Sequence, residues 1–199
     1  MNKYILNIQS NKKRLNQDLL FKNASLLLIS VATYCSEVIK KNIRAFNNIE
    51  EIKLDKFVYT EFLYFYIHAM LITADIISLT EFQKIKLRMF LEKTIATYAS
   101  GYFGESETDS WKENYISAFI NSLHEKEEDY NKFSDLQTRD IIPEFHFLSL
   151  FSRLAQNITS ILDKKEEKET ILLLTYEVST KEWAKMDPTE LLVKFKQLS

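Results

Sequence analysis

The stretch FVYTEFLYFYIHAMLITADIISL, from Phe57 to Leu79, decides the fold. It is apolar on nearly every side, and a helix that is apolar all round belongs in the interior of a helical bundle. Three polar residues interrupt it, Glu61, His68 and Asp75, each seven positions after the last. Because seven residues are close to two helical turns, we expect these side chains to form one narrow polar line on an otherwise apolar helix.

The composition of the whole chain predicts helices. The chain has 199 residues but only two Gly and two Pro, so it lacks the turn residues that a many-stranded sheet requires. Its length suits one domain covering residues 1–199, in which residues 1–10 form a loosely docked tail. We therefore predict an all-α, single-domain bundle of six or seven helices around the central apolar helix at about 57–79.

Capping residues predict where the helices begin. The Thr80-Glu81-Phe82-Gln83 segment and the Ser110 to Glu113 segment both have the form of a capping box. Pro143 suits a first helical turn. The remaining expected helix caps are Asn16 or Asn23 for a first helix that ends near Asn47, Asp55 for the central helix, and Asp187 for a terminal helix.

The segment from Ile171 to Val178 is locally ambiguous, because its length and its β-branched residues also permit a strand. No second good strand exists in the sequence for it to pair with. We therefore interpret residues 170–178 as part of a helix that continues to about Lys185.

Charge and cysteine content exclude several classes of protein. The net charge is −2, so there is no overall attraction to nucleic acid. Cys35 is the single cysteine, which rules out an internal disulfide and indicates a small core residue. The central stretch is long enough to span a membrane, but Glu61 and Asp75 would be costly in lipid. We therefore expect no membrane span and a soluble, cytoplasmic protein.

The common catalytic motifs are missing from the sequence. It contains no glycine-rich phosphate loop, no HExxH zinc helix and no G-x-S-x-G turn. None of its three histidines, His68, His124 and His146, follows a Glu by three residues, as the di-iron helix bundles require. We assign no catalytic residue, no metal ligand and no cofactor, and the sequence favours a non-enzymatic protein without deciding the matter.

Two functional classes stay open. The first is a helical interaction protein, with a protein partner or a homodimer, that uses aromatic surface left over from the core. The second is a small-ligand or metal-binding protein with a pocket at Glu61, Tyr64, His68 and Asp75. Seven residues span about 10.5 Å of helix, so a second helix must contribute to any such site. A pocket that opens onto Glu61 or His68 favours the second class, whereas a sealed core together with an exposed aromatic patch favours the first.

Two aromatic residues provide the interaction candidates. Tyr102 and Phe103 lie between Gly101 and Gly104, in a segment from Ser100 to Ser110 that we interpret as a loop. Adjacent aromatic rings are out of keeping with a polar connection. They either fold back over the end of the core or stay outside as an anchor for a partner.

Overall fold

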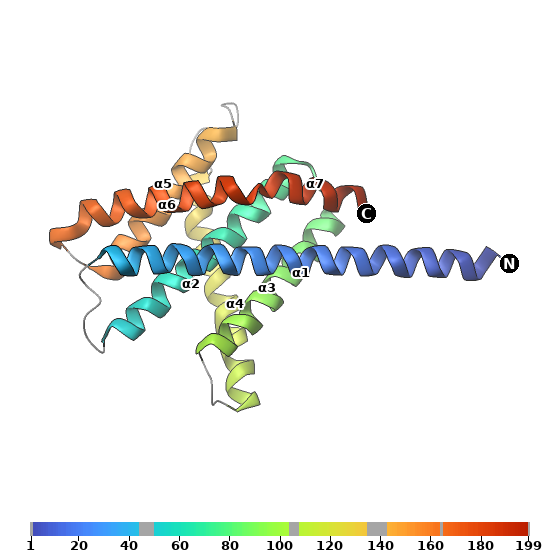
Figure 1. The fold of residues 1–199 in the computed structure, drawn as a ribbon, viewed down its shortest axis with the longest axis horizontal. Helices are drawn as coiled ribbons and strands as arrows, with labels where there is room; N and C mark the ends of the chain where they lie inside the picture. The colour runs from blue at the N-terminus through green and yellow to red at the C-terminus, as the bar shows by residue number, and fades with distance from the viewer. Residues whose placement is uncertain (1, 44–49, 104–107, 135–142, 164, 199) are drawn as a thin grey trace.

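The computed structural model describes residues 2–43, 50–103, 108–134, 143–163 and 165–198, and it leaves undescribed the side chains of residues 2–17, 50–53, 102–103, 133–134, 143–149, 165 and 198. The described residues form seven α-helices and one short 3-10 helix, and no strand (Figure 1). They are α1 (Asn2–Asn42), α2 (Glu50–Ile76), α3 (Glu81–Phe103), α4 (Asp109–Ser134), α5 (Pro143–Leu162), η1 (Lys165–Glu167), α6 (Lys168–Met186) and α7 (Pro188–Leu198). The predicted all-α fold is confirmed.

The α2 helix supplies the largest continuous share of the buried core. Every residue from Val58 to Leu71 except Thr60 is buried. The helix contacts α1, α3, α4, α5 and α7, and its Tyr66 side chain also reaches α6, which packs mainly against α1 and α5. Figure 1 shows α1 crossing in front of α2 and α3, with α6 and α7 running beside it.

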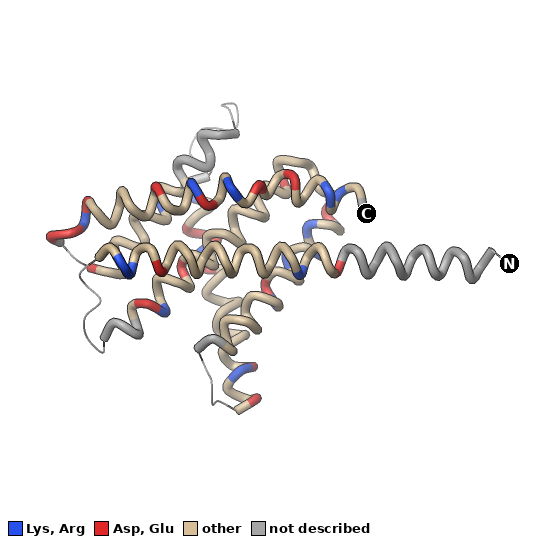
Figure 2. The backbone as a smooth tube through the Cα atoms, viewed as in Figure 1, with Lys and Arg blue, Asp and Glu red and all other residues tan. Residues whose placement is uncertain are grey.

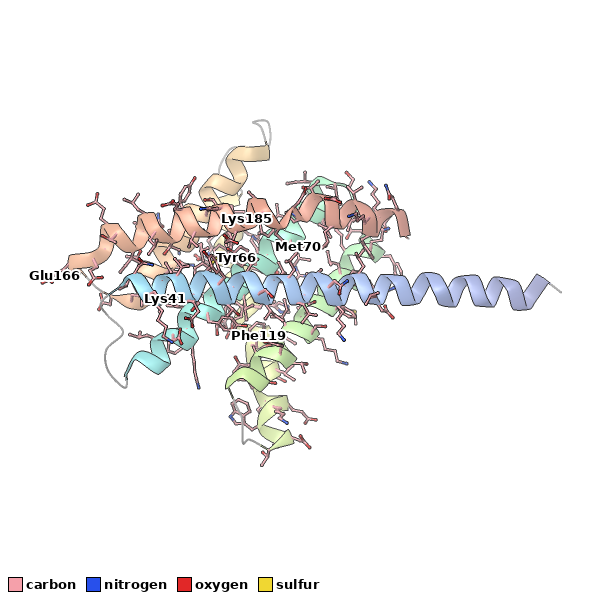
Figure 3. All side chains as sticks on the ribbon, in the orientation of Figure 1. Lys41, Tyr66, Met70, Phe119, Glu166 and Lys185 are labelled. Carbon is pink, nitrogen blue, oxygen red and sulfur yellow. The ribbon has the colours of Figure 1, made fainter. Side chains whose placement is uncertain are left out.

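Tyr66 ties three helices together in the core. It lies with Met70 in the crowded centre of the molecule, and both side chains are fully buried (Figure 3). The Tyr66 hydroxyl is 3.2 Å from the Cys35 thiol of α1 and donates to the carbonyl of Ser179 in α6 at 3.4 Å. Burial raises the pKa of Cys35 to about 12, so the thiol stays protonated and its predicted role as a core residue is confirmed.

Two of the predicted helix starts are confirmed by their hydrogen bonds. The Thr80 amide donates to the Gln83 side chain at 2.8 Å, and the Gln83 amide donates to the Thr80 hydroxyl at 3.3 Å. The Glu190 amide donates to the Asp187 carboxylate at 3.1 Å at the start of α7. These side chains satisfy amides that have no partner within the helix.

Other predicted boundaries were wrong. The first helix begins at Asn2, well before Asn16. Asp55 lies inside α2, where its carboxylate pairs with Lys40 at 2.9 Å and so joins α2 to α1. The cap of α4 is Thr108, whose hydroxyl accepts from the Trp111 amide at 3.3 Å. Ser110 is therefore already helical, and its pairing with Glu113 does not form the cap.

The predicted loop at Ser100 is helical as far as Phe103, because α3 continues through Gly101. The helix prediction for residues 170–178 is confirmed, since they lie within α6. The side chains of residues 1–10, the predicted tail, lie outside the described residues, and so do those of Tyr102 and Phe103.

Two segments, Asp18–Asn42 and Leu54–Ile76, are long and apolar enough to cross a membrane. In the most apolar 18 residues of each segment, the share that is buried inside the molecule is 50% for the first segment and 78% for the second. The uncharged part of α1, residues 23–36, is the tan stretch of that helix in Figure 2. Core helices of soluble proteins have the same length and composition, so the expected cytoplasmic location stays a prediction.

Candidate ligand-binding site

The structure places the three residues of the expected polar line in different surroundings. Glu61 is 2% exposed and His68 is 4% exposed. Asp75 is exposed, because α2 ends one residue later at Ile76, and its carboxylate pairs with Lys84 at 2.6 Å. Glu61 and His68 therefore lie in the interior, whereas Asp75 forms an ion pair at the surface.

Glu61 is fully supplied with hydrogen-bond donors from two other helices. Its Oε1 atom accepts from the Tyr130 hydroxyl of α4 at 2.7 Å and from the Asn157 amide of α5 at 2.7 Å. Its Oε2 atom pairs with the ammonium of Lys126 at 2.8 Å. A buried carboxylate is tolerated only with such donors, so this network fixes α2, α4 and α5 against one another.

A second ion pair, between Arg153 and Asp129, lies next to the Glu61 network. Arg153 of α5 donates to both carboxylate oxygens of Asp129 in α4, at 2.9 and 2.7 Å. The Arg153 guanidinium lowers the pKa of Asp129 below its ordinary value. Asn157 also reaches Asp129 at 3.4 Å, so the two carboxylates share one amide.

A pocket of about 510 Å³ opens onto Glu61 between α2 and α4. The Glu61–Lys126 pair and several aromatic rings line it. The residues that line it are Lys56, Phe57, Thr60, Glu61, Tyr64, Trp111, Tyr115, Ala118, Phe119, Ser122, Glu125, Lys126 and Ile161. Its size falls within the range of small-molecule sites, and its mostly apolar walls with a few polar groups are typical of them.

The aromatic wall comes from one face of α4. Trp111, Tyr115 and Phe119 are spaced four residues apart, so successive turns of α4 stack their rings towards α2. The Trp111 and Tyr115 centroids are 5.3 Å apart, and Phe119 packs on Tyr64 of α2 at 4.8 Å. Figure 3 labels Phe119 on this part of α4.

The pocket's two tyrosine hydroxyls are neutral and bonded to serine or threonine. Burial raises the pKa of Tyr115 to about 12, opposed by a hydrogen bond with Thr60. Burial likewise raises the pKa of Tyr64, which forms a hydrogen bond with Ser122. The walls therefore offer hydroxyl groups, whereas the charges come from Glu61, Lys126, Lys56 and Glu125.

His68 lies away from this pocket. Its ring stacks on Tyr130, with centroids 5.5 Å apart, and its Nε2 atom has no hydrogen-bond partner among the described residues. Burial, with the nearby charge of Arg88, lowers the pKa of His68 from 6.5 to about 4. The imidazole is therefore neutral at physiological pH and belongs to the sealed core.

The structure joins Glu61 and Tyr64 at one pocket and separates them from His68 and Asp75. Among the described residues, no group of three or more His, Cys, Asp or Glu is placed to hold a metal ion. His124, which we had left without a role, forms an ion pair with Glu92 at 3.2 Å when its ring is protonated.

Sequence reasoning missed the partners of Glu61. None of Tyr130, Asn157 and Lys126 stands out in the sequence as a site residue. One signal was available for Asn157: it lies at helical spacing from Leu154 and Ile161 on an apolar face of α5, and a buried amide needs polar partners. Nothing in the sequence indicated that it would meet Glu61.

The comparisons with protein-family models, curated proteins and solved structures found no match to this chain.

Proposed function

We propose that the protein binds a small organic amine in the pocket between α2 and α4. The observation that carries this proposal is the opening of an aromatic-walled pocket onto a buried carboxylate, Glu61. A pocket that opens onto Glu61 is the feature expected of a ligand-binding protein, and a protein with a sealed core would lack it. The interaction protein expected from the sequence stays a prediction.

The pocket walls select the body of the ligand. Phe57, Tyr64, Trp111, Tyr115 and Phe119 surround the cavity. Aromatic side chains bury large apolar areas and prefer flat or aliphatic groups. Since Phe57 is 61% exposed, it lies at the mouth and gains contacts when a ligand enters.

The polar end of the pocket selects the head group. Glu61 Oε1 accepts from Tyr130 and Asn157, which come from the core side, whereas Oε2 has Lys126 as its only partner in the described part of the chain. The Lys126 side chain is 36% exposed, so its ammonium can move into water while a ligand's ammonium takes its place at Oε2. Aromatic rings also attract cations, which favours an amine over an acid.

The experiment uses the two tryptophans as reporters in proton–nitrogen NMR spectra. Phenethylamine is titrated into the labelled protein. Phenylacetate and phenethyl alcohol, which also carry a phenyl ring but have a carboxylate or a hydroxyl in place of the amine, are titrated separately for comparison. We expect phenethylamine to shift the indole signal of Trp111. Trp183 packs against Tyr66 in the core, so its indole signal is the internal control.

Two alanine variants provide the matched control. Ala118 is exposed and lines the pocket, so Ala118→Phe fills the site from its rim without entering the core. Ala184 is an equally exposed helical alanine on α6. The amine should bind the Ala184→Phe protein and not the Ala118→Phe protein. Equal shifts of both indoles, equal response to all three probes, or binding that survives Ala118→Phe would contradict the proposal.

A further inference from the structure

A second hollow lies between α1 and α3. It is an open groove of about 710 Å³, and the two helices that form it are in contact. It shares no lining residue with the pocket at Glu61. The residues that line it are Lys22, Leu26, Ile29, Lys86, Met89, Phe90, Lys93, Thr94, Thr97 and Tyr98.

Large apolar side chains are exposed in this groove. Met89 is 65% exposed, Tyr98 is 46% exposed and Leu26 is 41% exposed. On α3 the same apolar face continues to Ile85 and Phe82, which are 56% and 76% exposed. Phe82, Ile85 and Met89 recur at helical spacing on one face of α3, whereas Leu26 and Tyr98 border the groove from α1 and from further along α3. Exposed apolar surface of this kind marks interaction sites.

The rim of the groove is positively charged. Lys22 lies on α1, and Lys86 and Lys93 lie about two turns apart on α3. The Lys86 ammonium is 5.7 Å from the Phe21 ring, whereas Lys22 and Lys93 have no ion-pair partner among the described residues. None of the described residues that line the groove is acidic, so a partner with carboxylates would be attracted to it.

We infer that this groove is a docking site for an amphipathic helix of another protein, with acidic residues on both sides of its apolar stripe. Its apolar floor fits the side chains of a helix that insert at intervals of three and four residues. The lysines pair with the acidic flanks, and the flexible Met89 adapts to the inserted side chains.

The groove's shape and charge argue against two other occupants. A lipid bilayer is flat, and it would leave the concave floor between α1 and α3 uncovered. The N-terminal segment of a second copy carries Lys12, Lys13 and Arg14, so its charge matches that of the rim and repels it. This site is independent of the proposed amine pocket, and either can fail without the other.

The experiment selects binders from a phage-displayed library of helices with one face randomised, using the full chain as bait. The selected helices should carry apolar residues at three- and four-residue spacing and Asp or Glu beside them. Fluorescence anisotropy then measures the affinity of each selected peptide for variants of the protein. We expect Met89→Glu to weaken binding at least about tenfold, because it places a charge on the apolar floor.

Leu173→Glu is the matched control, since Leu173 is also 65% exposed but lies on α6. Lys22→Glu combined with Lys93→Glu should also weaken binding at least about tenfold, whereas Lys181→Glu should not. The inference is overturned if the selected helices are neutral or basic, or if Met89→Glu and Leu173→Glu bind alike. It is also overturned if no helix is selected, if phosphatidylserine vesicles bind in place of peptides, or if Met89→Glu dissociates a dimer.

Discussion

Glu61 and His68 lie two turns apart on α2 and are almost equally buried, yet they differ in their hydrogen-bond partners. Glu61 receives two hydrogen bonds and an ion pair from α4 and α5, and it faces a pocket. His68 stacks on Tyr130, and its Nε2 atom has no partner among the described residues.

The difference follows from the charge of each group. A carboxylate enters the core only if donors replace the water that it loses, so Glu61 requires a polar environment around it. An imidazole avoids the same cost by losing its proton, which is why burial lowers the pKa of His68. Glu61 and its partner Lys126 form the polar end of the pocket, whereas the neutral His68 ring lies in an apolar part of the core.

The largest effect is expected from Glu61→Ala. This change removes the acceptor of the buried Tyr130 hydroxyl, leaves the Asn157 amide with only its longer contacts, such as that to Asp129 at 3.4 Å, and removes the partner of Lys126. We expect the free energy of unfolding to fall by roughly 3–5 kcal/mol, measured by urea denaturation. Asp75→Ala is the control, because its exposed ion pair with Lys84 contributes about 0–1 kcal/mol. Equal losses in the two variants would show that the Glu61 network does not stabilise the fold.

The next effect is acid destabilisation through His68. Its pKa is lower in the folded protein than in the unfolded chain, so the unfolded chain binds a proton first as the pH falls. Stability is therefore complete above about pH 6.5 and is lost progressively down to about pH 4. The loss should be about 3 kcal/mol, followed by urea denaturation across this range. Asp129 also has a lowered pKa, so the stability that it contributes begins to be lost only as the pH falls below the ordinary aspartate pKa of 3.8.

Two histidine variants assign this acid effect. His68→Phe should abolish the loss between pH 6.5 and 4, whereas His124→Gln, the control, leaves His68 in place and should retain the loss. An unchanged loss in the His68→Phe protein would mean that another group is responsible.

The smallest effect is expected from His68→Phe at neutral pH. The substitution keeps an aromatic ring against Tyr130 and removes an Nε2 atom without a described partner. The free energy of unfolding should therefore change by less than about 1.5 kcal/mol, measured by urea denaturation at neutral pH. A larger loss would indicate a hydrogen bond to His68 and would make its surroundings resemble those of Glu61.

The sequence predicted the fold class because helix signals are local. Capping at Thr80 and Asp187 depends on residues three positions apart, and both were found. The cap at Thr108 was missed because Ser110 matched the same pattern two residues later. The first helix was placed too late because its opening residues show no apolar period.

The site was only partly predictable. Periodicity placed Glu61 and Tyr64 on one helix, but the partners Tyr130 and Asn157 are 69 and 96 positions away from Glu61 in the chain. Such contacts depend on how the helices cross, which single-helix patterns do not specify. The same limit explains why seven-residue spacing grouped Asp75 with two buried residues, although the end of α2 exposes it.

The most direct test of the difference between the two residues is the affinity of phenethylamine for two variants, measured by isothermal titration calorimetry. Glu61→Gln removes the charge at the polar end of the pocket, and His68→Phe alters the core beyond it. We predict that Glu61→Gln weakens binding at least about tenfold and that His68→Phe leaves the affinity unchanged. Equal affinities for the two variants, or a loss confined to His68→Phe, would contradict the assignment of Glu61 to function and of His68 to structure.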